Sequence, residues 1–174
     1  VTDSVKKTNR GLTMAEASRQ AGDDAGYTQA MEKAFAAAKS SALLDPLVGI
    51  RSFLAIADVR YRFQENEGAL ACVREAAACC EGIENAEVRA NRFARCAGYF
   101  ARHGDTAGWS TMLERADRCI PQIARRGGYF EKSSPFSIKC SAYSEAGDWQ
   151  QAFSQVQSLE KVLPTDSRPK RPEY

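Results

Sequence analysis

The sequence of 174 residues contains a single histidine and lacks the common signatures of catalytic sites. No GxSxG, HExxH, GxxxxGK[ST] or GxGxxG motif occurs, and the carboxylates are scattered without a candidate catalytic pair. His103 lies in the segment RHGD, which predicts a helix-ending turn where a polar or positive side chain meets free carbonyl groups. We therefore expect no enzyme activity, no cofactor and no metal site.

Long apolar runs and a strong net charge are also missing. No segment approaches the roughly 20 consecutive apolar residues that a membrane-spanning helix requires, so we expect no membrane span. A net charge of +2 is too small to attract nucleic acid or an anionic membrane by long-range electrostatics. Any charged partner is therefore expected to be recognised by a local patch.

The six cysteines show neither paired CxxC spacing nor the density of a disulfide scaffold. This usage predicts reduced thiols, and it makes the cytoplasm the expected location. The first residue is Val1, and a targeting segment removed ahead of it would leave no trace in the sequence. Cysteine usage is thus the only sequence feature that bears on the compartment.

Helical periodicity is what the chain has in abundance, because Ala, Leu, Glu, Arg and Gln dominate and no alternating β-branched run occurs. We predict helices at residues 13–21, 25–41, 46–63, 67–82, 86–102, 106–120, 135–145 and 149–162. Thr13 and Glu16 fit a capping box, while Asp45-Pro46 and Ser134-Pro135 each fit an N-cap followed by proline. Residues 1–12 and the proline-rich residues 163–174 are predicted to be flexible tails.

One segment recurs along the chain. GDDAGYTQAMEKA at residues 22–34 returns as GDTAGWSTMLERA at residues 104–116, with six of the thirteen positions identical. The two copies begin 82 positions apart. A related segment, QENEGALACVREA at residues 64–76, lies about halfway between them, and a fourth copy begins at Gly147. The resulting period of about 40 residues is typical of solenoids. We predict one domain, residues 13–162, with repeats at residues 13–41, 45–82, 85–126 and 134–162.

This repeat resembles the tetratricopeptide type, in which a Gly-Asp turn joins two antiparallel helices, small residues follow and a proline ends the second helix. The matching residues after the third and fourth turns are Trp109, Ala116 and Pro121, and Ala152, Leu159 and Pro164. The resemblance implies an all-α fold, a right-handed superhelix of about four antiparallel helix pairs, here with repeats longer than the usual pattern. It also implies a scaffold for protein–protein interaction, without catalytic residues.

The predicted helix at residues 86–102 has a basic face opposite its apolar stripe. The candidate partner-binding residues recur there every three or four positions: Arg89, Arg92, Arg95, Tyr99 and Arg102. Arginine binds carboxylates in a bidentate fork. The resemblance implies that the first helix of each pair lines a concave groove, so we predict that this face binds an acidic or amphipathic peptide of a partner protein. The alternative is a solvated face with local ion pairs.

Two other functions stay open from the sequence. The helix at residues 149–162 keeps apolar residues such as Val156 and Leu159 with no later helix to cover them, which fits a self-assembling, homo-oligomeric protein. RRGGYF at residues 125–130 is similar to Arg/Gly segments that bind RNA, although a turn explains the same residues. Among these functions, peptide binding is our main prediction.

Cys79 and Cys119 occupy equivalent positions in successive repeats, forty residues apart. Equivalent positions lie on neighbouring helices in a stacked array, so this pair could form a disulfide or take part in a metal site. Buried cysteines that act as small core hydrophobes are far commoner, and we expect that role here.

Overall fold

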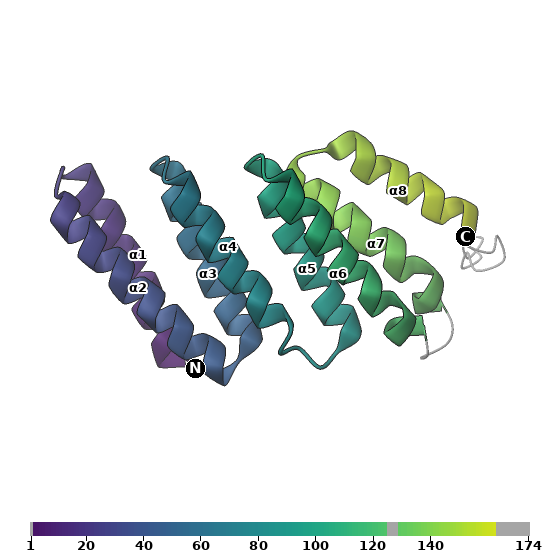
Figure 1. Ribbon diagram of the computed structural model, residues 1–174, viewed down its shortest axis with the longest axis horizontal. Coiled ribbons are helices and arrows are strands. Elements are labelled where there is room, and N and C mark those ends of the chain that lie inside the picture. The colour runs from purple at the N-terminus through teal and green to yellow at the C-terminus, as the bar shows by residue number, and fades with distance from the viewer. Residues whose placement is uncertain (1, 125–128, 163–174) are drawn as a thin grey trace, which may run out of the picture.

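The computed structural model describes residues 2–124 and 129–162, and every regular element within these ranges is an α-helix. The eight helices in this part of the chain are α1 (Thr2–Gln20), α2 (Asp24–Leu44), α3 (Pro46–Arg62), α4 (Asn66–Cys80), α5 (Ala86–Arg102), α6 (Thr106–Ala124), α7 (Tyr129–Ala146) and α8 (Trp149–Val162). Consecutive helices pack as antiparallel pairs, which follow one another from α1–α2 at one end to α7–α8 at the other (Figure 1). The predicted all-α fold of helix pairs is confirmed.

The turns within the four pairs share one geometry. Gly22, Gly104 and Gly147 have positive φ angles of 74°, 77° and 80°, and Gln64 has 63° at the same place in the second pair. The next amide in every turn donates a 2.9 Å hydrogen bond to the carbonyl oxygen five positions earlier. This Schellman geometry satisfies a carbonyl that would otherwise be free at the helix end. The repeated sequence segment therefore begins at a repeated turn.

An aspartate that follows the glycine caps the second helix in three of these turns. Asp23 accepts a hydrogen bond from the Gly26 amide at 2.8 Å, and Asp105 and Asp148 make the same bond at 2.8 and 3.0 Å. Glu65 stands at this position in the second pair and makes no side-chain cap. A side-chain cap is worth about 1 kcal/mol. The second turn thus departs from the others at two adjacent residues.

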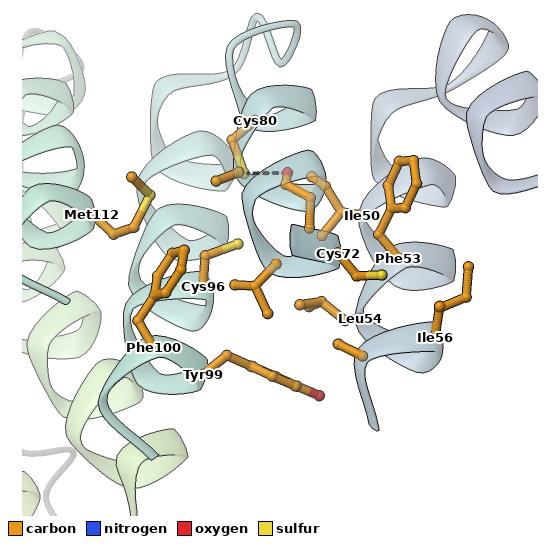
Figure 2. Packing of buried hydrophobic residues seen from close by; sticks show 14 of the residues in the cluster. Ile50, Phe53, Leu54, Ile56, Cys72, Cys80, Cys96, Tyr99, Phe100 and Met112 are labelled. Carbon is orange, nitrogen blue, oxygen red and sulfur yellow. Dashed lines mark hydrogen bonds between the residues drawn. The ribbon is translucent and has the colours of Figure 1, made fainter. Parts of the chain in front are cut away.

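The apolar core runs between the paired helices. Two flanks of α3 are buried, with Phe53 and Ile56 on one and Ile50 and Leu54 on the other. Figure 2 shows these side chains beside buried residues of α4, α5 and α6, among them Phe100. Each such side chain contributes roughly 1.5–3 kcal/mol of burial free energy. This shared core holds successive pairs together.

The first helix begins earlier than predicted, so the prediction of a flexible tail at residues 2–12 is wrong. Thr8 and Gly11 are buried in α1, and a Cβ atom added to Gly11 would lie 2.9 Å from the Cβ atom of Ala34. The buried residues before Leu12 are thus a threonine and a glycine, and neither gives the apolar periodicity from which a buried helix face is predicted. The capping box is also wrong, because the Thr13 hydroxyl donates to the Asn9 carbonyl within α1.

Two other predicted helix boundaries are corrected. Pro121 was expected to end its helix, but α6 continues to Ala124, because burial of Ile123 favours one further turn despite the lost hydrogen bond. Ser134-Pro135 lies inside α7, which begins at Tyr129. Asp45 does cap α3 as predicted, accepting from the Leu47 amide at 2.9 Å. The C-terminal tail at residues 163–174, with Pro164, lies outside the described residues.

Candidate functional site

Glu145 of α7 lies between two arginines of α5. Its Oε2 atom is 3.1 Å from Nη2 of Arg102, and its Oε1 atom is 3.4 Å from Nε of Arg95. Nε of Arg102 also donates a 2.9 Å hydrogen bond to the main-chain oxygen of Glu145. Two guanidinium groups therefore share the carboxylate of Glu145.

Gly98 makes this arrangement possible by letting α5 and α7 approach closely. A Cβ atom on Gly98 would overlap the Cβ atom of Glu145 and lie 2.9 Å from the carbonyl oxygen of Ala142. No side chain fits in that space. Arg95 and Arg102 lie about one helical turn before and after Gly98, so both reach the glutamate opposite it.

Tyr99 connects the same surface to α3. Its ring is buried, and its hydroxyl donates a 3.1 Å hydrogen bond to Oδ2 of Asp58. Burial, reinforced by the nearby Asp58 carboxylate, raises the pKa of Tyr99 to about 12. Desolvation raises the pKa of Asp58, against the opposing effects of the Tyr99 hydroxyl and of the Arg102 and Arg95 charges. The guanidinium of Arg102 also lies over the Tyr99 ring, 5.1 Å from its centroid.

Arg89 and Arg92 have different surroundings. Nη2 of Arg89 donates to Gln122 of α6 at 2.7 Å, and Nη1 donates to the carbonyl oxygen of Ile83 at 3.2 Å. Arg89 therefore ties the start of α5 to α6. Arg92 is partly exposed and makes no ion pair or hydrogen bond with any described residue. Of the five predicted residues, Arg92, Arg95, Tyr99 and Arg102 share one face, and Arg89 turns away from it.

We call this set the α3–α5–α7 surface: Asp58, Arg92, Arg95, Tyr99, Arg102 and Glu145. Sequence reasoning missed Asp58 and Glu145, although a signal for both exists. Asp58 and Tyr99 are 41 positions apart, and Arg102 and Glu145 are 43 positions apart. Both separations equal about one repeat, so each pair joins matching helices of adjacent repeats. A search for complementary polar residues at the repeat period would have found both acids.

His103 ends α5, where the sequence placed it, but packing explains its role better than charge does. The imidazole stacks on Tyr61 of α3, with the two ring planes 12° apart. Burial, together with the Arg102 charge, lowers the pKa of His103 to about 4. The ring is therefore neutral at neutral pH, and it offers no positive charge to the helix end.

The cysteines are free thiols in or beside the core. Cys79 and Cys119, whose pairing the sequence left open, form no disulfide: Sγ of Cys119 accepts from Arg89 at 3.4 Å, while Cys79 lies near Gly49. The Cys96 thiol and burial raise the pKa of Cys80, whose Sγ donates to a main-chain oxygen (Figure 2). Within residues 2–124 and 129–162, no group of His, Cys, Asp and Glu side chains is arranged to hold a metal ion.

Comparisons with known proteins add no family to this description. No protein-family model matches the chain, and a search of curated proteins gives no significant match. None of the helices in the described ranges combines the length and apolar character of a membrane span. The side chains of RRGGYF, at residues 125–130, lie outside the described part of the chain. Function must therefore be argued from the surface itself.

Proposed function

We propose that the protein is a non-catalytic, tetratricopeptide-like interaction module that binds an acidic or amphipathic peptide segment of a partner protein. The observation that carries this proposal is the excess positive charge of the α3–α5–α7 surface, which has three arginines and two acids. Arg95 and Arg102 pair with Glu145 and also lie near Asp58, while Arg92 is partly exposed and has neither acid as an ion-pair partner. A right-handed superhelix would place this surface on the concave side of the array, where an extended or helical peptide could lie.

An acidic side chain of a peptide could pair with the exposed parts of these arginines. Nε of Arg95 is buried and lies 3.4 Å from Glu145, but the Arg95 side chain is 38% exposed, and Arg92 is partly exposed beside it. A peptide carboxylate next to these two guanidinium groups would form a charge-assisted pair. Such a bond contributes about 1.5–3 kcal/mol where water is partly excluded. Binding should weaken with salt, since the site is open to solvent.

The test compares Arg92→Glu with a matched charge reversal on another helix. Arg118 of α6 is exposed, and its ion pair within the described part of the chain is a 3.8 Å contact with Glu114, so Arg118→Glu controls for the change in net charge. Displayed libraries of short peptides, one rich in Asp and Glu and one rich in Lys and Arg, would be selected against the wild type. We expect binders from the acidic library whose affinity falls at least tenfold in Arg92→Glu and stays within about twofold in Arg118→Glu.

Two results would contradict the proposal. The first is an acidic library that yields no binder while the basic library does. The second is an acidic binder whose affinity is the same for Arg92→Glu and wild type, which would place the peptide elsewhere. Far-ultraviolet circular dichroism of both variants would confirm that the helices are intact, as exposed substitutions usually change stability by less than about 0.5 kcal/mol.

A further inference from the structure

A groove runs between α1 and α2 on the side that faces away from α3. It has a volume of about 570 Å³, and its floor is made of small residues that include Gly11, Ala36 and Ala37. The opposite side of α2 packs on α3, where the rings of Phe35 and Phe53 lie 5.4 Å apart. The groove is thus the side of the first pair on which no described helix packs.

Cations surround this groove. Lys7 and Arg10 of α1 and Lys33 of α2 line it, together with the exposed side chain of Met14, and none of the described lining residues is acidic. Lys7 pairs with Asp3 one turn earlier at 2.7 Å, but both side chains are highly exposed. Such a pair contributes little, so it leaves the rim basic. The groove therefore suits an apolar segment with aromatic side chains, because their rings can pack on the small residues and contact the cations of the rim.

The other end of the array presents a complementary helix face. Trp149, Phe153 and Val156 of α8 are 69%, 61% and 41% exposed, while Ala152 is buried. The three exposed residues are spaced i, i+4 and i+7, which places them along one face of a helix. Two exposed aromatic rings within five residues form an apolar strip that no described residue covers.

The strip and the groove agree in length and chemistry. Residues 149–156, 7–14 and 33–40 each span seven steps of a helix, about 10 Å at 1.5 Å per residue. Cations already lie over aromatic rings inside the array, with Arg19 5.0 Å from the Tyr27 centroid. Trp149 and Phe153 against the basic rim would repeat that contact, and a small-residue floor admits bulky rings.

We propose that α8 of one copy docks in the α1–α2 groove of a second copy, joining chains head to tail. This is helix-in-groove recognition between two different surfaces of the same protein. Because the groove and the strip are two different surfaces, each copy that joins leaves one groove and one strip free, and further copies can add. A single helix in a groove buries a small area, so the affinity should be in the range of about 10–100 µM.

The test is the mass of the protein in solution, measured by sedimentation velocity from about 5 to 500 µM. The wild type should increase in average mass with concentration. Met14→Glu in the groove and Phe153→Glu in the strip should each remain monomeric alone. An equimolar mixture should form dimers and nothing larger, since the first variant keeps its strip, the second keeps its groove, and only one junction can form. Lys33→Glu and Trp149→Glu are a second pair that should behave alike.

Leu43→Glu is the matched control, because Leu43 is 89% exposed on α2 and lies outside both surfaces. This variant should associate like the wild type. A wild type that stays monomeric at 500 µM, a variant pair whose mixture stays monomeric, or association that survives both Met14→Glu and Phe153→Glu would overturn the proposal. None of these variants changes the α3–α5–α7 surface, so peptide binding and self-association fail or succeed independently.

Discussion

The turns inside the helix pairs and the junctions between pairs are built in different ways. All four turns place one residue in the left-handed region and close with the same 2.9 Å hydrogen bond. The junctions have no common chemistry: Phe35 meets Phe53 between α2 and α3, whereas Gly98 meets Glu145 between α5 and α7. A turn must satisfy the same backbone groups wherever it occurs, but a junction depends on its own neighbours. Features that distinguish this protein from other arrays of helix pairs are therefore expected at the junctions.

The largest expected effect comes from breaking the junction between α5 and α7. Gly98→Ala forces a methyl group against Glu145 and Ala142, and overpacking of this kind costs about 2 kcal/mol. The melting temperature should fall by roughly 5 °C. Hydrogen exchange should rise in α7 and α8 before it rises in α3 and α4, since only the last pair loses its neighbour.

Gly68→Ala is the matched control for that substitution. A Cβ atom on Gly68 would meet the end of the Arg60 side chain, which is flexible and can move aside. This variant should be as stable as wild type or more stable by up to about 1 kcal/mol, because alanine favours the helix. Equal losses of stability in Gly68→Ala and Gly98→Ala would mean that the close approach of α5 and α7 does not contribute more to stability than an ordinary helix position.

An effect of intermediate size on stability is expected at His103. This residue ends α5 at the turn to α6, and its ring also packs on Tyr61 across the junction between α3 and α5. The pKa of His103 is about 4 in the folded protein and near 6.5 when unfolded, so the unfolded chain binds the extra proton between these values. Stability from this residue is complete above pH 6.5 and is lost as the pH falls toward 4. Since the ring is partly exposed, we expect a loss of about 1 kcal/mol between pH 7 and pH 5.

Urea unfolding at the two pH values would measure this change. His103→Asn cannot titrate, so its free energy of unfolding should fall less over the same interval, and the difference from wild type isolates the imidazole. Identical pH dependence in the two proteins would show that His103 remains accessible to protons in the fold.

The smallest effect should follow from making the second turn like the others. Gln64→Gly removes a left-handed residue that has a Cβ atom, and it should stabilise the protein by about 0.5 kcal/mol after the greater freedom of unfolded glycine is counted. Gly104→Gln is the reverse change, in a turn with open space around the glycine, and it should destabilise by about 1 kcal/mol. Chemical denaturation measures both, and like signs for the two variants would contradict the equivalence of the turns.

Much of the fold could be read from the sequence because turns and apolar stripes are local. Gly104 and Asp105 belong to the repeated segment, and they form the turn before α6. The apolar stripe predicted within residues 86–102 is the buried face of α5, which includes Phe93 and Phe100. The first half of α1 could not be read, since Thr8 and Gly11 pack by small size and not by apolarity. Residues of that kind are also common in exposed segments, so spacing alone does not distinguish the two cases.

The candidate surface was predicted in part. The helical period placed Arg92, Arg95, Tyr99 and Arg102 on one face. It could not reveal that Glu145 neutralises some of their charge, because that contact crosses 43 residues and follows the repeat period instead. Arg89 was grouped with them from its spacing, and drift of the helix face over thirteen residues turned it toward α6. Peptide binding and the right-handed superhelix stay predictions.

The four turns lie along one edge of the array (Figure 1). A Cβ atom added at Gly22, Gly104 or Gly147 would meet no atom of another part of the chain within 4 Å, so the left-handed backbone is the main restriction at these sites. Fluorophores attached at neighbouring exposed turn positions would form a row in chain order. Energy transfer between two of them would follow the bending of the whole array when a partner binds, without touching a helix face.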